Sequence, residues 1–182
     1  RNRANLYKKQ AQYEKAIADY TSIVAKSPQD RSAHIARAQS KKLNKDFMGA
    51  AEDYGQLIEI FPAMKYRYCI DRGKCYLQNR QFQLALQDFD AALQSRENYY
   101  PAYVEKSWLL ATCPELNLRD GTEAKVLAIK ACEIVQHRQW RCLETLAAAC
   151  AENGEFEEAI DWQTKALEMT PNDEHRNAAE ER

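Results

Sequence analysis

The sequence is poor in residues that interrupt helices, since its 182 residues include only five glycines and five prolines. This composition favours long helical segments over the turn-rich patterns of β-proteins. The sequence also lacks any run of about 18 apolar residues, so we expect no segment that spans a bilayer and no membrane partner. The hydrophobic fraction of 45% and the charged fraction of 29% are typical of a folded, water-soluble protein.

Sequence signatures of catalysis and cofactor binding are also missing. The chain contains no GxxxxGK[ST], GxGxxG, HExxH or GxSxG pattern. Its three histidines, His34, His137 and His175, are far apart. Adjacent carboxylates such as Glu157 and Glu158 face different directions on a helix. We therefore expect no enzyme activity, no catalytic residue and no cofactor.

Cysteine is present, but without a metal-binding or disulfide pattern. No CxxC occurs, and no histidine stands near a cysteine pair at the spacing of zinc ligands. We expect reduced, buried thiols and no metal, which suits a cytoplasmic location. The pair that the spacing excludes least firmly is Cys113 with Cys132. Because the helical pattern already begins at Arg1, we expect that the natural N-terminus, with any signal peptide, precedes this sequence.

Charge is unevenly distributed, although the net charge is only −1. Residues 1–62 carry a net charge of +4, residues 63–98 carry +2 and residues 99–182 carry −7. This polarity could orient a partner or support weak head-to-tail self-association, and it could equally be unselected variation of solvated surface charge. The chain as a whole is not basic and has no nucleic-acid-binding motif, so we expect no nucleic-acid partner.

A pattern of small and aromatic residues repeats at intervals of 34 or 35 residues. In the clearest copies an aromatic residue precedes an alanine by three positions, and another aromatic follows that alanine by four. The repeat alanines are Ala16, Ala50, Ala85, Ala124 and Ala159. The fourth copy follows after 39 residues, and we assign the excess to a loop at Pro114–Arg119. Asp120 and Glu123 then resemble a capping box that starts the next helix.

A second small residue precedes each repeat alanine by twelve positions, except in the fourth copy, where the loop displaces it. These residues are Ala4, Ala38, Gly73, Ser107 and Ala147. Two helices approach closely only where their side chains are small, so each unit should be a helical hairpin whose wider gaps are filled by the aromatics. The helices are expected at 1–10, 12–26, 30–44, 46–60, 64–79, 81–95, 99–112, 120–135, 139–153, 155–169 and 173–182.

These features resemble the tetratricopeptide-repeat (TPR) family, and the fourth and fifth copies look like a variant pair seen in bacterial TPR proteins. The resemblance implies an all-α fold, a right-handed superhelical solenoid of about five helix-turn-helix repeats and a C-terminal capping helix at 173–182. It predicts one array over 1–182, with repeats at about 1–30, 31–64, 65–99, 100–138 and 139–172.

The resemblance also implies a binding groove lined by the first helix of each repeat. The groove residues it indicates are Asn5, Lys8, Lys42, Arg67, Ile70, Asp71, Lys74, Val104, Glu105 and Trp108. Its lysines and arginine suit an acidic or extended peptide, and Trp108 is the best candidate anchor. Chaperone-type TPRs clamp a C-terminal carboxylate, but Ala36 and Asp71 replace two clamp residues here, which argues against that mode.

The sequence therefore favours a protein-protein interaction scaffold that binds a peptide or partner protein in the concave groove. Two alternatives stay open: a self-assembling structural module, and a regulatory arm of a larger enzyme whose catalytic part lies outside this chain. We also expect ion pairs between neighbouring repeats. Asp19, Asp53 and Asp88 would pair with the basic residue of the next repeat, respectively Arg37, Arg72 and Lys106. Each pair would then join the second helix of one repeat to the first helix of the next.

Overall fold

The computed structural model describes residues 1–170, and within them it contains ten α-helices and no strand. The helices are α1 (Asn2–Lys9), α2 (Tyr13–Lys26), α3 (Arg31–Leu43), α4 (Phe47–Ile60), α5 (Lys65–Gln78), α6 (Phe82–Ser95), α7 (Tyr100–Thr112), α8 (Gly121–Ile134), α9 (Trp140–Glu152) and α10 (Phe156–Glu168). Short 3-10 turns lie at Pro62–Met64 and Leu116–Leu118. These ten helices confirm the predicted ones to within one or two residues at each end, and the expected capping helix at 173–182 lies outside the described residues.

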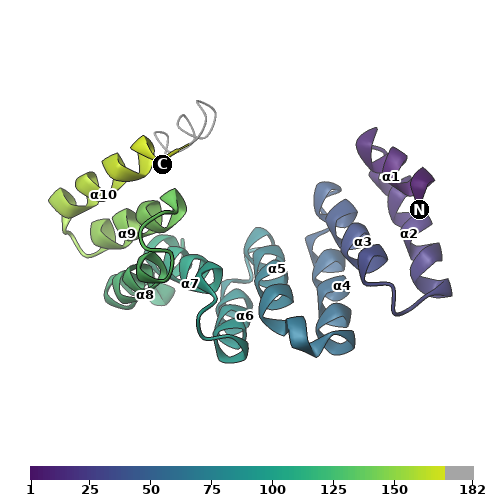
Figure 1. The fold of residues 1–182 in the computed structure, drawn as a ribbon, viewed down its shortest axis with the longest axis horizontal. Helices are drawn as coiled ribbons and strands as arrows, with labels where there is room; N and C mark the ends of the chain where they lie inside the picture. Colours follow the sequence, from purple (N-terminus) through teal and green to yellow (C-terminus); the bar gives the residue numbers. More distant parts are fainter. Residues whose placement is uncertain (171–182) are drawn as a thin grey trace. The chain divides into compact units, whose positions relative to one another are not determined.

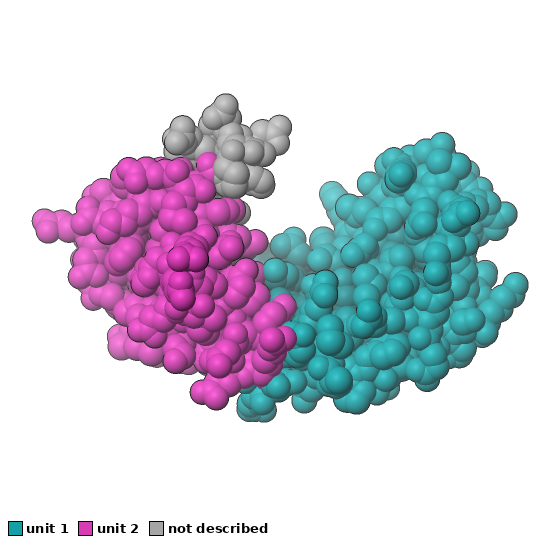
Figure 2. Space-filling model, in the orientation of Figure 1, with its two compact units in different colours: residues 1–95 teal, residues 96–182 magenta. Residues whose placement is uncertain are grey.

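Consecutive helices pack as hairpins, as Figure 1 shows. The chain forms two compact units, residues 1–95 and residues 96–182, which Figure 2 colours separately. In the first unit α1 packs on α2, α3 on α4 and α5 on α6, while α3 and α5 also pack on the helices that precede them. In the second unit α7 packs on α8 and α9 on α10, and α9 also contacts both α7 and α8. No helix within residues 1–170 has both the length and the hydrophobicity of a bilayer span.

The predicted small positions lie at the hairpin contacts. Ala4 and Ala16 are fully buried, as are Ala38 and Ala50. Gly73 is the smallest of the set for a steric reason, because an added Cβ would lie 2.6 Å from Cε1 of Phe89. The aromatic ring of Phe89 therefore occupies the space that a side chain at Gly73 would need.

In each short turn between paired helices, one residue adopts a left-handed backbone conformation. Ala11, Lys45 and Arg80 have φ values of 55°, 61° and 59°, and Gly154 has a φ of 77°. All four stand seven residues after the small residue of the first helix, so the left-handed position recurs in register. The longer loop of the fourth repeat replaces it, and there Asp120 caps α8 by accepting a hydrogen bond of 2.8 Å from the Glu123 backbone N–H.

The aspartates Asp19, Asp53 and Asp88 pair with the arginine of their own hairpin, so the expected pairing between neighbouring repeats is wrong. Arg37 donates to both carboxylate oxygens of Asp53, at 3.0 Å from Nε and 2.7 Å from Nη2. Bidentate contacts of the same kind join Arg3 to Asp19 and Arg72 to Asp88. The reason is geometric: Arg37 and Asp53 are equidistant in sequence from the turn residue Lys45, so they meet across an antiparallel hairpin.

The fourth repeat also forms an ion pair within its hairpin, but with a different acidic residue. Its basic residue, Lys106, has Leu127 at the position where the other hairpins carry aspartate. Lys106 Nζ instead lies 2.6 Å from Glu123 Oε1, one helical turn before Leu127. The neighbouring Ser107 hydroxyl donates a hydrogen bond of 2.7 Å to the Ala124 carbonyl oxygen. The hairpin thus keeps an ion pair and gains a polar contact at its small position.

Removal of Asp53 should destabilise the protein far more than removal of Asp19. The Asp53 side chain is 1% exposed and that of its partner Arg37 is 10% exposed, whereas Arg3 beside Asp19 is 71% exposed. An uncompensated buried charge costs about 3–5 kcal/mol, so Asp53→Ala should lower the free energy of unfolding by about that amount. Asp19→Ala should give a much smaller loss. Urea titrations followed by circular dichroism measure both, and equal losses would contradict the buried-pair interpretation.

Candidate functional site

Three of the predicted groove residues lie on α1 and α3, where they form a polar surface. Lys8 Nζ donates a hydrogen bond of 2.7 Å to Gln39 Oε1, which joins the first helices of two successive hairpins. Partial burial lowers the pKa of Lys8. Asn5 Oδ1 accepts a hydrogen bond of 2.5 Å from the buried hydroxyl of Tyr20, so Asn5 also supports the core. Lys42 is half-buried near the end of α3.

The four predicted groove residues on α5 differ in accessibility. Arg67 is exposed, Asp71 and Lys74 are half-buried, and Ile70 is only 4% exposed. Burial, and then the Asp71 carboxylate, raise the pKa of Tyr54, while Arg67 acts in the opposite direction. Asp71 and Arg67 therefore have opposite effects on the pKa of the buried Tyr54 hydroxyl. The part of α5 that a ligand can reach is polar, with Ile70 beneath it.

Two of the three predicted groove residues on α7 are buried. Val104 is 5% exposed and belongs to the core of the second unit, together with Leu143 and Leu146. Glu105 is 9% exposed, and its Oε1 lies 3.6 Å from Nη2 of Arg141. Trp108 is half-buried.

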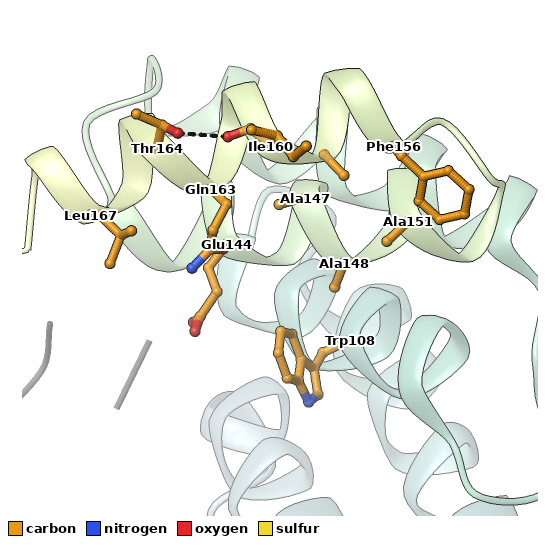
Figure 3. A pocket seen from close by; sticks show the side chains of 11 residues that line it. Trp108, Glu144, Ala147, Ala148, Ala151, Phe156, Ile160, Gln163, Thr164 and Leu167 are labelled. Atoms are coloured by element: carbon orange, nitrogen blue, oxygen red, sulfur yellow. Dashed lines mark hydrogen bonds between the residues drawn. The ribbon is translucent and has the colours of Figure 1, made fainter. Parts of the chain in front are cut away.

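Trp108 lines a cavity of about 560 Å³ between α7, α9 and α10 (Figure 3). Alanines of α9 and α10 form its floor, and the large apolar side chains of Phe156, Ile160 and Leu167 come from α10. Figure 3 shows Gln163 extending from α10 toward Glu144 of α9, opposite the Trp108 ring. The cavity is thus mainly apolar, with a small polar group at one side.

The α10 residues of this cavity were missed by the sequence analysis, which assigned the groove to the first helix of each repeat. A signal was present, because Phe156, Ile160 and Leu167 follow the spacing of one helix face. That spacing would have indicated an apolar face on the second helix of the fifth repeat.

Cys150, Glu155 and Glu158 have ligand-type atoms within 4.8 Å of one another. Lys125 Nζ lies 2.5 Å from Glu155 Oε2 and 2.9 Å from Glu158 Oε2. Glu155 and then Glu158 raise the pKa of Lys125, and Lys125 lowers the pKa of Glu158. The positive charge among these carboxylates is therefore the lysine ammonium, and the cluster links α8 to α10.

Comparison with known families agrees with this architecture. Two tetratricopeptide-repeat sequence models match the chain, one over residues 1–64 and the other over residues 141–173. Together they cover just over half of its length. The chain belongs to the tetratricopeptide-repeat family. No curated protein matches this sequence significantly.

Solved TPR proteins share the fold of this TPR chain. MamA from Desulfovibrio magneticus RS-1 is 15% identical with a TM-score of 0.68, and the match covers 93% of this chain and 96% of that one. YrrB, a TPR protein with an unusual peptide-binding site, is 18% identical with a TM-score of 0.65, covering 100% and 90%. A thermophilic TPR protein from Thermus thermophilus is 17% identical with a TM-score of 0.71, covering 97% and 93%.

The cysteines of this TPR protein are all free and all buried. Cys132 of α8 and Cys142 of α9 lie in the same core cluster, a proximity that the sequence spacing had not indicated. The neighbouring Cys142 thiol and burial raise the pKa of Cys132. Burial raises the pKa of Cys69, Cys75 and Cys150 to about 11 in each case. Each of these thiols is therefore protonated at neutral pH.

The native protein should react slowly with thiol reagents. At pH 8 a thiol with a pKa of about 11 is roughly one part in a thousand thiolate, the reactive form. We expect labelling of the native protein to be at least about a hundredfold slower than labelling in urea, since burial also restricts access. Under non-reducing conditions the urea-unfolded chain should titrate all six thiols. A titre below six would reveal a disulfide, and rapid labelling of the native protein would contradict the burial of the cysteines.

Proposed function

We propose that this TPR protein is a non-catalytic interaction scaffold that binds a peptide or partner protein through the first helices of its hairpins. The observation that carries the proposal is the position of Trp108, half-buried at the edge of an open apolar cavity. Tryptophan is enriched among the residues that dominate binding energy, because it offers a large rigid apolar surface. A cavity of about 560 Å³ beside it can accept several partner side chains.

Residues of the first unit support a ligand with acidic or extended character. Lys8, Lys42, Arg67 and Lys74 come from α1, α3 and α5, the first helices of three successive hairpins. The contact between Lys8 and Gln39 supports a common surface for α1 and α3. Charges of this kind increase association rates and select oppositely charged partners more than they add affinity.

Asp71 makes a free C-terminal carboxylate a poor ligand for this surface. Its carboxylate lies among the basic residues of α5 and would repel a second carboxylate at short range. Acidic side chains spread along an extended peptide could instead reach Lys42 or Lys74 separately. YrrB supports a peptide ligand in a general way, since its known property is an unusual peptide-binding site.

The proposal predicts that Trp108→Ala and Lys74→Glu reduce capture of a partner from an extract of the source cell. Each should lower the captured amount by about tenfold or more, because the first removes an anchor and the second reverses a charge. Lys130→Glu is the matched control, since Lys130 is exposed on α8, a second helix, and should leave capture unchanged. Circular dichroism of each variant verifies the fold.

Sedimentation of the purified protein separates this function from self-assembly. A binding scaffold should sediment as one species over a wide concentration range, and Lys74→Glu should not change that species. A salt-sensitive oligomer that forms with rising concentration would favour the assembly role. Equal capture by the wild type, Trp108→Ala and Lys74→Glu would refute binding through the first helices.

A further inference from the structure

Two buried cysteines lie on opposite sides of the junction between the fourth and fifth hairpins. Cys132 is near the end of α8 and Cys142 is near the start of α9, and both are equally far in sequence from His137 in the connecting turn. Because α8 and α9 pack against one another, residues at equal distances from the turn come together, as Arg37 and Asp53 do in the second hairpin. Both cysteines are fully buried and belong to the same core cluster.

The backbone of the turn is bonded to the same two residues. The His137 N–H donates a hydrogen bond of 2.8 Å to the Cys132 carbonyl oxygen, and the Cys142 N–H donates one of 3.0 Å to the Gln139 carbonyl oxygen. Cys132 and Cys142 therefore hold the two ends of this turn. A covalent bond between their sulfur atoms would close the turn into a ring.

The two thiols differ in their tendency to ionise. The neighbouring Cys142 thiol, together with burial, raises the pKa of Cys132. The Cys132 thiol lowers the pKa of Cys142 against the effect of burial, and the Arg141 guanidinium acts in the same direction as Cys132. Cys142 is thus the thiol that ionises first, and the thiolate is the form of cysteine that attacks an oxidant.

The turn that covers this pair is exposed and conformationally strained. Residues 136–139 are all exposed, and Gln136 and His137 have φ values of 52° and 56°, which are unfavourable for residues other than glycine. The His137 ring stacks on Trp162 of α10, with ring centroids 6.0 Å apart. Exposed turns of this kind open locally at a lower free-energy cost than helices, so a small oxidant can reach Cys142 while the hairpins stay folded.

Cysteines that share a helix have the wrong geometry for a disulfide. Cys69 and Cys75 are both on α5, about 9 Å apart along the helix axis, and Cys142 and Cys150 are both on α9, about 12 Å apart. A disulfide requires its two Cα atoms to lie within about 7 Å of each other. Cys132 and Cys142 avoid this limit because they come from two helices that pack together.

We propose that Cys132 and Cys142 are a site of oxidative modification, at which hydrogen peroxide converts the two thiols into a reversible disulfide. The Cys142 thiolate attacks one oxygen of the peroxide, which gives a sulfenic acid and releases hydroxide. The Cys132 sulfur then attacks the Cys142 sulfur, and the departing hydroxyl group takes up the Cys132 proton as water. In total the two thiols lose two electrons and two protons, and one peroxide is reduced to two waters.

The disulfide would act beside the predicted binding groove. It would fix the first turn of α9, which also carries Arg141, and Nη2 of Arg141 lies 3.6 Å from Oε1 of the groove residue Glu105 on α7. Oxidation would therefore restrain the link between α7 and α9 on that surface. The inference does not depend on the proposed scaffold function, because the chemistry needs only the two thiols and the oxidant.

Thiol counting and peptide mapping test the site on the full chain. The reduced, folded protein is treated with hydrogen peroxide, freed of excess oxidant, unfolded in urea and alkylated. The thiol titre should fall from six to four, because two thiols join, and dithiothreitol should restore it to six. Cleavage after Arg138 and Glu144 should yield a non-reduced peptide pair that joins Cys132 to Cys142 and excludes Cys150.

Two alanine variants provide the matched comparison. Cys142→Ala removes one thiol of the pair, so its titre should be five both before and after peroxide treatment. Cys75→Ala also removes a fully buried helix cysteine but leaves the pair intact, so its titre should fall from five to three. Circular dichroism before and after treatment verifies that both variants and the wild type remain folded.

Four results would overturn the inference. The first is a wild-type titre that stays at six while peroxide is present in excess. The second is a loss of thiols that dithiothreitol does not reverse, which indicates further oxidation in place of a disulfide. The third is a mapped bond that joins two chains or includes another cysteine. The fourth is an equal loss of thiols in Cys142→Ala and in the wild type.

Discussion

The close approach of the two helices in each hairpin is the constraint on which the rest of this structure depends. It requires a side chain no larger than that of alanine or serine at one position of each helix. Where the opposing ring presses closest, at Phe89, only glycine fits, as Gly73 shows. The aromatic residues, the ion pairs and the turn residues are then all placed at fixed distances from this contact. Five hairpins can therefore share one architecture while differing at most other positions.

The helices could be predicted well because the small residues of the hairpin contact recur in the sequence at a nearly regular interval. Small residues at Ala38 and Ala50, followed by an aromatic such as Tyr54, specify where two helices meet and where the turn between them lies. Helix ends then follow from capping residues such as Asp46, whose side chain accepts a hydrogen bond of 2.9 Å from the Gly49 backbone N–H. Local signals of this kind do not depend on the rest of the fold.

The pairing of acidic with basic residues was harder to predict from the sequence than the positions of the helices. The sequence showed which residues were basic and acidic, but both possible pairings place an arginine near an aspartate in the same periodic pattern. In the fourth repeat Lys106 pairs with Glu123, because Leu127 stands where the other hairpins carry aspartate. Which acidic residue a base can reach depends on side-chain length, which the repeat interval does not specify. Of the candidate site, Trp108 was predicted and does line a cavity. The burial of Ile70 and Val104 was missed, because it depends on packing that a helix-position rule does not contain.

The second unit does contain ion pairs between hairpins, at other positions. Lys125 of α8 reaches Glu155 and Glu158 of the next hairpin, and Arg119 lies 3.2 Å from Glu152 at its Nη1. These pairs involve partly exposed side chains, so removing one partner should cost less stability than removing one partner of the buried pair of Arg37 and Asp53. These pairs between hairpins thus lie near the surface, whereas the pair of Arg37 and Asp53 within one hairpin lies in the interior.

The confinement of the buried pair to one hairpin also affects how such a protein can change in length. Arg37 and Asp53 both lie between residues 31 and 64, so excision or duplication of that segment removes or copies both charges together. Neither event leaves a lone charge in the interior, which would be the most costly defect. Whole-repeat gain and loss at the level of the gene therefore carries little electrostatic risk, and arrays of different lengths can arise from the same module.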